Sequence, residues 1–343
     1  MLYAVGLFFI GVIVLVLLSL YGNGVFTSTV VPVVVPSSKL MVTDSKQEKE
    51  KTSDHDARQW LREFFDTTLP AWNVPADHLL IGSAHCTDYR FIEAQFESLK
   101  AFVKTPFTYF VINDVKRDER PDRYQAILEA CTKHDIKHIT FHPGLHTDRT
   151  ILLPETQLPG DTNASARASD VVQFMLHIFR THKGYTLMLD SDCVVVNPLV
   201  PAQILSSDFT YAGPPQTRWS EKRQKHLDYV WIVVILFDMA NFPNPELMNL
   251  DCGWIDGVRM DTGGMWNTYI EKTNNIPRAL KEDYTDPIMQ EIKEKYPRVE
   301  CFENQFLHFH NGSQWENITD EQHAELVKGW LETVQKIVQL RKV

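Results

Sequence analysis

From residue 55 onward, short apolar runs alternate with stretches in which apolar residues recur at helical spacing. The short runs predict buried strands at residues 79–83, 108–112, 138–141 and 186–189. The helical spacing predicts helices at residues 91–103, around 124–131 and at 171–180. Strands separated by helices in this way are typical of a largely parallel sheet with helices on both faces. Ligands of such sheets bind beyond the carboxyl ends of the strands, so the residues that follow each strand are the first candidates for a functional site.

Three further patterns complete the predicted globular part, which shows no internal repeat. Apolar residues at helical spacing predict a helix before the first strand, at Trp60, Phe64 and Phe65. The apolar run 229–237 is too short to cross a bilayer and predicts one buried strand. A last amphipathic helix is predicted at 318–343, with one apolar face formed by Leu326, Trp330, Val334 and Val338.

The first residues of the chain differ from this pattern. Residues 2–21 contain no charge and are almost wholly apolar, and at about 1.5 Å per residue they cover the roughly 30 Å core of a bilayer. A cleaved signal peptide is the alternative, but it would have a shorter apolar region, a basic start and a small-residue cleavage site. We therefore expect a transmembrane anchor at 1–21, a disordered polar stalk at 22–54 and a globular domain at 55–343. Since the folded part follows the anchor, we expect a single-pass membrane protein of the Golgi or endoplasmic reticulum with this domain in the lumen.

Charge and cysteine content narrow the possible partners. The 343 residues include 34 Lys and Arg against 44 Asp and Glu, for a formal net charge of −10. Because non-specific nucleic-acid binding needs clustered basic residues, this balance argues against a nucleic-acid partner. To bind an anionic substrate, the protein would need local positive charge, such as a metal ion or a helix N-terminus. Five cysteines without a CxxC pair argue against a disulfide scaffold and a structural zinc site.

The strongest candidate for chemistry is Asp190-Ser191-Asp192, which stands between the apolar runs 186–189 and 193–196. Side chains at positions i and i+2 of an extended chain point the same way, so both carboxylates can face one site. Hard divalent cations such as Mn²⁺ and Mg²⁺ take carboxylate and phosphate oxygens. A plain turn is the alternative, because Asp and Ser are common turn residues. The two buried strands around the carboxylates favour the cation site.

This motif resembles the metal-binding motif of GT-A-fold glycosyltransferases, in which a strand, an Asp-x-Asp and an apolar strand ending in Asn-Pro follow one another. The resemblance covers residues of about 76–315. It implies a GT-A fold, which is Rossmann-like and has a mixed, mostly parallel sheet flanked by helices. It also implies a UDP- or GDP-linked sugar donor, a hydroxyl acceptor on a glycan, glycoprotein or glycolipid, and Mn²⁺ or Mg²⁺ as cofactor. Asp190 would contact the ribose and the metal, and Asp192 would bind the metal.

A second motif, which runs from His308 to Trp315, is similar to the last strand and loop of several GT-A families. The resemblance implies that His308 is the remaining protein ligand of the metal and that the backbone at Gly312 approaches the diphosphate. His310 lies two residues further along the same strand face and is the alternative ligand. A buried strand with incidental histidines is the other interpretation. An imidazole beside a carboxylate suits Mn²⁺ rather than Ca²⁺.

The ends of the first two predicted strands supply the candidates for nucleotide binding. In the GT-A fold the turn after the first strand surrounds the base and ribose, which assigns that role here to Ser83, Ala84, His85 and Asp88. Asp88 could instead cap the helix that follows. Asp114, after the second strand, could contact the nucleotide or belong to an ordinary turn.

Two further segments complete the predicted site. The resemblance implies that Arg167, near the start of the helix before Asp-Ser-Asp, faces the nucleotide sugar, and a guanidinium binds phosphate through two hydrogen bonds. Asp256 and Asp261, in Gly-containing segments, are candidates for binding sugar hydroxyls or for the base that deprotonates an acceptor. The glycines beside Asp261 favour it, although a capped loop is the alternative. Trp254 and Trp266 could stack on a sugar or pack in the core.

Taken together, the sequence predicts a membrane-anchored enzyme that moves a sugar from a nucleotide-diphosphate sugar to an acceptor hydroxyl with Mn²⁺. A metal-dependent phosphotransferase or nucleotidyltransferase on a similar scaffold is the first alternative. An inactive, membrane-tethered binding module of the same fold is the second. The presence of Asp190, Asp192 and His308 argues against the inactive module, since such a protein has no need of all three.

Overall fold

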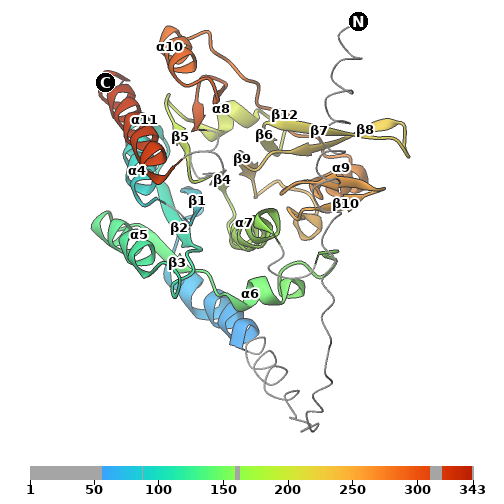
Figure 1. Ribbon diagram of the computed structural model, residues 1–343. Helices are drawn as coiled ribbons and strands as arrows, with labels where there is room; N and C mark the ends of the chain where they lie inside the picture. Colours follow the sequence, from blue (N-terminus) through green and yellow to red (C-terminus); the bar gives the residue numbers. More distant parts are fainter. Residues whose placement is uncertain (1–55, 87, 159–162, 310–318, 342–343) are drawn as a thin grey trace, which may run out of the picture. The chain divides into compact units, whose positions relative to one another are not determined.

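The structure is a computed structural model that describes residues 56–86, 88–158, 163–309 and 319–341 (Figure 1). All of these residues belong to one compact unit, Gln47–Val343. The predicted anchor at 1–21, the predicted stalk at 22–54, and the positions of His310 and Gly312 lie outside the described residues. Within the described ranges, none of the helices combines the length and apolar character that a membrane span needs.

A seven-stranded sheet forms the centre of the unit. Its strands are β1 (Leu79–His85), β2 (Phe107–Asn113), β3 (Lys137–Thr140), β4 (Tyr185–Leu189), β6 (Tyr211–Gly213), β9 (Val234–Asp238) and β12 (Arg278–Ala279), in the order β12-β6-β9-β4-β1-β2-β3. β1 is parallel to β2 and β4, β2 is parallel to β3, and β12 is parallel to β6. β9 is antiparallel to both of its neighbours. The prediction of a mixed, mostly parallel sheet is confirmed.

Smaller sheets pack around this one. They are a three-stranded sheet of β5 (Cys193–Val195), β13 (Val299–Phe302) and β14 (Phe306–Phe309), and the hairpins of β7 (Pro215–Ser220) with β8 (Lys225–Val230) and of β10 (Gly253–Ile255) with β11 (Val258–Met260). β5 follows β4 after three residues but leaves the central sheet and pairs with β14. In this pairing Cys193 lies opposite His308. The chain thus places the segment after β4 beside a strand from near the end of the chain.

Helices cover the central sheet and the smaller sheets around it. They are α4 (Arg90–Phe102), α5 (Pro121–Lys133), α6 (Gly144–Thr147), α7 (Ala164–Thr181), α8 (Pro201–Leu205), α9 (Trp266–Thr273), α10 (Pro287–Lys295) and α11 (Asp320–Arg341), with 3-10 turns η2 (Arg149–Ile151) and η3 (Pro245–Leu247). The helical segment 56–63 continues through the π-helix η1 (Phe64–Thr68) into α3 (Leu69–Ala71). The predicted helices are confirmed, but α7 begins earlier than the apolar spacing indicated. Asn163 caps it by accepting a hydrogen bond from the backbone of Ala166.

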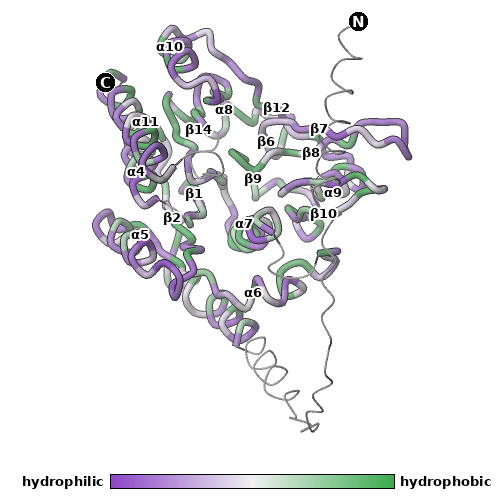
Figure 2. The backbone as a smooth tube through the Cα atoms, in the orientation of Figure 1, coloured by the Kyte–Doolittle hydropathy of each residue, from purple (hydrophilic) through white to green (hydrophobic). Residues whose placement is uncertain are grey.

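Two apolar clusters lie on the two faces of the central sheet. Leu79 and Ile81 of β1 belong to the cluster that α4, α5 and α11 cover. Leu80, between them, belongs to the opposite cluster, which contains Phe174 of α7 and Phe64 of η1. Figure 2 shows apolar residues along central strands such as β2 and β9, whereas the β7–β8 hairpin is largely hydrophilic. The alternation along β1 follows from the two-residue period of a strand with both faces buried.

Two predicted elements are corrected by the structure. The run 229–237 is not one strand, because β8 ends at Val230 in a hairpin and β9 begins at Val234 in the central sheet. On α11 the buried face contains Val327, Trp330 and Val334, whereas Leu326 is 40% exposed. The prediction is therefore confirmed for Trp330 and Val334, and wrong for Leu326, whose place in the core Val327 takes.

Candidate functional site

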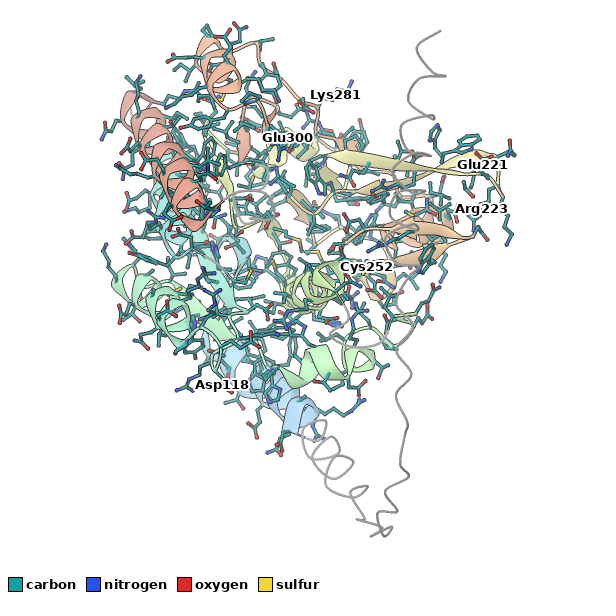
Figure 3. All side chains as sticks on the ribbon, viewed as in Figure 1. Asp118, Glu221, Arg223, Cys252, Lys281 and Glu300 are labelled. Atoms are coloured by element: carbon teal, nitrogen blue, oxygen red, sulfur yellow. The ribbon has the colours of Figure 1, made fainter. Side chains whose placement is uncertain are left out.

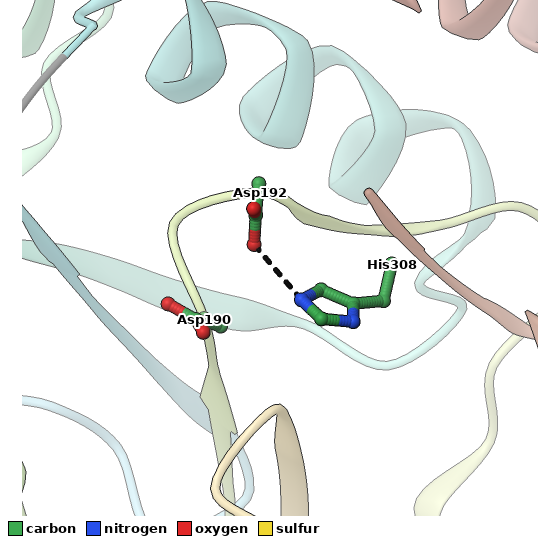
Figure 4. Close-up of side chains that lie close together, drawn as sticks. All are labelled: Asp190, Asp192 and His308. Carbon is green, nitrogen blue, oxygen red and sulfur yellow. Dashed lines mark ion pairs between the residues drawn. The ribbon is translucent and has the colours of Figure 1, made fainter. Parts of the chain in front are cut away.

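Three side chains with metal-ligating chemistry meet where β4 ends. Asp190 and Asp192 lie in the short connection from β4 to β5, and His308 lies on β14. One ligand atom of each lies within 4.8 Å of those of the other two (Figure 4). His308 Nε2 is 3.2 Å from Asp192 Oδ1. The structure therefore brings together the three residues that the sequence analysis assigned to one metal ion.

The donor atoms of this cluster fit a divalent cation. Asp192 is only 2% exposed, and its Oδ1 has no hydrogen-bond partner among the described residues, although His308 Nε2 lies within ion-pair distance. A buried carboxylate oxygen without a hydrogen bond is costly unless a cation or a proton is supplied. Carboxylates suit Mn²⁺ and Mg²⁺, and a neutral imidazole completes a set of three protein ligands.

Glu300 and Trp231 orient His308 from its other sides. Glu300 on β13 lies opposite His308, and its Oε2 is 2.8 Å from His308 Nδ1. The Trp231 ring packs edge-on against the imidazole, with ring centroids 5.3 Å apart. When the neutral ring carries its proton on Nδ1 and donates a hydrogen bond to Glu300, Nε2 is unprotonated. Its lone pair then points toward the aspartates. This is the orientation that a metal ligand requires.

The electrostatics of the cluster favour a cation. Burial and the charge of Asp192 raise the pKa of Asp190 above its ordinary range. Burial by itself would lower the pKa of His308, but Asp192 and Glu300, with a contribution from Asp190, raise it above its ordinary value. Both shifts arise because carboxylates crowd a space with little water. A bound divalent cation would stabilise the ionised aspartates and displace the proton from Nε2.

A buried polar cluster holds the Asp190–Asp192 connection in place. Gln95 of α4 donates hydrogen bonds of 2.7 Å from Nε2 to the carbonyl oxygens of Asp190 and Cys193. Its Oε1 accepts hydrogen bonds from Ser83 Oγ at 3.1 Å and from the Tyr109 hydroxyl at 2.7 Å. One side chain thus ties both ends of the connection to β1, β2 and α4.

The turn after β1 contains the predicted nucleotide-binding residues. Ser83 and His85 are buried and contact each other at 2.8 Å, and burial lowers the pKa of His85 to about 4. Asp88 accepts a hydrogen bond from the backbone of Arg90 and pairs with its guanidinium at 2.6 Å. The capping alternative is not confirmed, because Tyr89 is the N-cap residue of α4 and no side chain caps this helix. Ala84 is partly buried. The side chains of Ser83, His85 and Asp88 thus contact other protein groups in this structure.

Asp114 and Arg167, predicted separately, form one cluster. Arg167 Nη2 lies 3.2 Å from Asp114 Oδ2, and both side chains are partly exposed. His146 of α6 approaches the same carboxylate, with Nε2 at 2.7 Å from Asp114 Oδ1. The backbone N–H of Asp114 donates to the carbonyl of His85, which fixes this cluster beside the turn after β1.

The two candidate bases occupy different places. Asp261 accepts a hydrogen bond of 2.8 Å from Ser165 Oγ in the first turn of α7, which also carries Arg167. Asp256 lies in the turn between β10 and β11, and its carboxylate pairs with Arg223. Arg223 lies at the end of the β7–β8 hairpin (Figure 3). Asp261 is thus the candidate that contacts the first turn of α7, through Ser165 two residues before Arg167.

The segment that follows Asp261 lies close to the backbone of another segment, as its glycines predicted. Gly263 has a φ of +85°, and a Cβ there would lie 2.9 Å from the carbonyl oxygen of Val230. Trp266, which follows, is fully buried and donates to the Tyr211 hydroxyl at 3.1 Å, so it packs in the core and cannot stack on a sugar. Trp254 is 48% exposed.

Sequence reasoning missed three residues of this region, Gln95, Glu300 and His146. Gln95 occupies the buried face of α4 between Ile92 and Leu99, where the spacing calls for an apolar residue. Glu300 interrupts an otherwise apolar strand. A polar residue at an apolar position was therefore the available signal for these two. His146 carried no comparable signal, because α6 is a single turn.

Comparisons with known proteins give the following. No protein-family model matches the chain, and no curated protein matches it. Apo mouse xyloside xylosyltransferase 1 is a similar solved structure, at 12% identity and a TM-score of 0.40, with 60% of this chain and 84% of that chain covered. The PaToxG glycosyltransferase is another, at 11% identity and a TM-score of 0.31, with 84% and 89% covered. Both neighbours are glycosyltransferases.

Proposed function

We propose that this chain is a glycosyltransferase that moves a sugar from a nucleotide-diphosphate sugar to an acceptor hydroxyl with the help of Mn²⁺ or Mg²⁺. The observation that carries the proposal is the meeting of Asp190, Asp192 and His308 at the carboxyl end of β4. A protein with a net charge of −10 needs a cation to hold an anionic diphosphate, and this cluster offers ligands for one. The resemblance of both motifs to the GT-A glycosyltransferases supports the same activity.

Each residue has a role that follows from its chemistry and place. Asp190, Asp192 and His308 hold the cation, which when bound supplies Lewis-acid stabilisation of the charge on the leaving diphosphate. Arg167 binds phosphate oxygens. Asp261 binds sugar hydroxyls or accepts the proton of the acceptor hydroxyl. We propose Asp261 rather than Asp256 for this role, because the carboxylate of Asp256 pairs with Arg223.

The remaining predicted residues surround the nucleotide in this proposal. The backbone from Ser83 to His85 and the groups of Asp88 and Asp114 border the base and ribose, as the resemblance implies. Gly312 would bring its backbone to the diphosphate. A UDP- or GDP-linked sugar is the donor class that this arrangement would take.

A panel of nucleotide sugars tests the activity. The full chain, purified in detergent, is incubated with UDP- and GDP-linked sugars in Mn²⁺ or in EDTA, and the products are separated. Release of free sugar and nucleoside diphosphate in Mn²⁺ is expected, with loss in Asp192→Asn and no change in the exposed control Asp208→Asn. Sugar phosphate with nucleoside monophosphate, or phosphate transfer from a nucleoside triphosphate, would instead identify the phosphotransferase or nucleotidyltransferase. Absence of any Mn²⁺-dependent turnover, with nucleotide binding retained, would identify the inactive module.

We further propose that residues 1–21 anchor the protein in the membrane of the Golgi or endoplasmic reticulum, with the catalytic domain in the lumen. The uncharged, apolar character of residues 2–21 supports this. Sodium carbonate extraction and protease protection of intact microsomes are the measurements. A protein released by carbonate, or digested without detergent, would contradict the anchor or the orientation respectively.

A further inference from the structure

Polar side chains on one face of α7 hold the segment that precedes β10. Ser165, Ser169 and Gln173 follow one another at intervals of four residues, so they lie on the same face of the helix. Ser169 Oγ accepts a hydrogen bond of 3.0 Å from the backbone N–H of Cys252, and Gln173 Oε1 accepts one of 3.0 Å from the backbone N–H of Leu250. The position of this segment is therefore set by α7.

Ser165, the first residue of this face, contacts the segment that follows β11. Its Oγ donates a hydrogen bond of 2.8 Å to Asp261 Oδ1. Its backbone carbonyl oxygen accepts one of 3.1 Å from the hydroxyl of Thr262, which is buried. Two contacts in opposite directions thus join the turn that contains Asp261 to the first turn of α7.

The two carboxylate oxygens of Asp261 have different surroundings. Oδ1 accepts hydrogen bonds from Ser165 Oγ and from the backbone N–H of Thr262, both at 2.8 Å. No group within the described part of the chain donates to Oδ2 or forms an ion pair with this carboxylate. The residue is exposed, so Oδ2 is available to a ligand.

Asp256, the other candidate base, has a cation at each oxygen. Lys222 Nζ lies 3.0 Å from its Oδ1, and the guanidinium of Arg223 contacts its Oδ2. Hydrogen bonds from Lys222 and Arg223 hold the pKa of Asp256 below its ordinary value. A carboxylate that is stabilised in its ionised form at both oxygens is a poor acceptor of protons. Only Asp261 combines one fixed oxygen with one available oxygen.

We propose that Ser165 is a positioning residue, whose hydroxyl fixes Oδ1 of Asp261 so that Oδ2 takes the proton of the acceptor hydroxyl. This rests on the proposed function, in which Asp261 is the candidate base. The acceptor oxygen bonds to the anomeric carbon of the sugar and gives its proton to Oδ2. The bond from that carbon to the diphosphate breaks, and its electron pair leaves with the diphosphate. A base must be held within hydrogen-bond reach of the proton that it takes, which a carboxylate fixed at one oxygen achieves better than one that rotates.

Hydrolysis of the donor tests this role, with water as the acceptor. The full chain in detergent and Mn²⁺ is given the UDP- or GDP-linked sugar that the wild type hydrolyses fastest. Ser165→Ala should lower kcat about tenfold or more and leave KM for the donor within about twofold, because the hydroxyl acts on the base and not on the donor. Ser165→Thr, which keeps the hydroxyl, should recover most of the rate. Ser207→Ala, whose exposed Oγ donates to Asp208 Oδ1 at 3.3 Å, is the matched control and should match the wild type.

A double variant separates positioning from support of the fold. Ser165→Ala with Asp261→Asn should be no more than about twofold slower than Asp261→Asn alone, because residues that act as a unit are not additive. A serine that only supported the fold would cost activity in either background. If Ser165→Ala fails to fold by circular dichroism, Ser165→Cys, of similar size and with a weak donor, takes its place with the same expected loss. N-linked glycans are removed enzymatically from all proteins first, since Ser165→Ala also removes the glycosylation sequence that begins at Asn163.

The outcomes distinguish this proposal from the proposed function. A wild type that releases sugar from none of the donors contradicts both. With an active wild type, an unchanged kcat in Ser165→Ala, no recovery in Ser165→Thr, or equal losses in the two backgrounds would overturn the proposal alone. Proton NMR of the first sugar released gives a further test, because direct attack opposite the diphosphate inverts the anomeric configuration. Retained configuration would overturn the role of Asp261 as base, and with it that of Ser165, but not the proposed function.

Discussion

Glu300 lies directly opposite His308 on neighbouring antiparallel strands, and its Oε2 is 2.8 Å from His308 Nδ1. Directly opposed residues have their side chains on the same face of a sheet, so this contact follows from the register of β13 and β14. A carboxylate behind a histidine fixes the orientation of the ring and increases the basicity of the other nitrogen. Glu300 is therefore a supporting partner of the candidate metal ligand rather than a ligand itself.

Removal of the Glu300 carboxylate should weaken metal binding. In Glu300→Gln, we expect the affinity for Mn²⁺ to fall by about 10- to 100-fold, the range known for lost supporting partners of metal ligands. Titration calorimetry of the full chain with Mn²⁺ measures this. Glu291→Gln, at an exposed position of α10, is the matched control and should bind as the wild type does. Unchanged affinity in Glu300→Gln would show that the ring is oriented without it.

Asp192 and His308 should behave as one unit. We expect Asp192→Ala, His308→Ala and the double variant to share a similar, low residual rate of Mn²⁺-supported turnover, because losses are not additive once the ion has lost a ligand. Initial rates against Mn²⁺ concentration measure this, and circular dichroism checks the fold. His310→Ala should lose less activity. Full activity in His308→Ala with loss in His310→Ala would identify His310, and not His308, as the metal ligand.

Gln95 should stabilise both the fold and the site. In Gln95→Leu, the carbonyl oxygen of Cys193 loses its side-chain donor, and that of Asp190 keeps the backbone N–H of Cys193. We expect a loss of about 2 kcal/mol or more in the free energy of unfolding, since a buried polar group left without a partner costs about 1–3 kcal/mol. Urea unfolding measures it, and weaker Mn²⁺ binding should accompany it. Gln125→Leu, on the exposed side of α5, serves as the control; equal stability of the two variants would contradict the role of Gln95.

Cys86 offers a chemical probe of the nucleotide site. It is the one exposed cysteine, since Cys131, Cys193, Cys252 and Cys301 are buried. Local burial of the sulfur, with Asp114 and Asp190 nearby, raises the pKa of Cys86 to about 12. The thiolate fraction then grows with pH throughout the neutral range, so we expect slow alkylation by iodoacetamide that speeds up about tenfold per pH unit from 7 to 9.

Nucleotide should protect this thiol. UDP or GDP with Mn²⁺ is expected to slow alkylation of Cys86, because the residue follows β1 at the edge where the donor is proposed to bind. Peptide mass spectrometry locates the label, and folded Cys86→Ser should take up almost none. Rapid labelling that nucleotide leaves unchanged would place the nucleotide elsewhere.

The local pattern of the chain was enough for the elements of its first half, up to β4, and for part of the candidate site. Alternating apolar runs and amphipathic segments predicted β1, β2, β3 and β4 and the helices between them. This was possible because the spacing of apolar residues in a strand or a helix is a property of a short stretch of sequence. The paired carboxylates of Asp190 and Asp192 were visible for the same reason, since both follow one strand within three residues. His308 was found only through its resemblance to a known motif.

Tertiary contacts decided the rest. β5 could have continued along the central sheet, but it pairs with β14, and this pairing alone brings His308 to the aspartates and Glu300 to His308. The hydrogen bonds of Gln95 and the contacts of His146 join segments far apart in the chain. No local period encodes which distant partner a buried polar side chain will meet, because that depends on how strands and helices pack. The sequence by itself therefore determined the strands and helices with a clear local period and the two neighbouring aspartates, whereas packing determined which residues join and orient the candidate site.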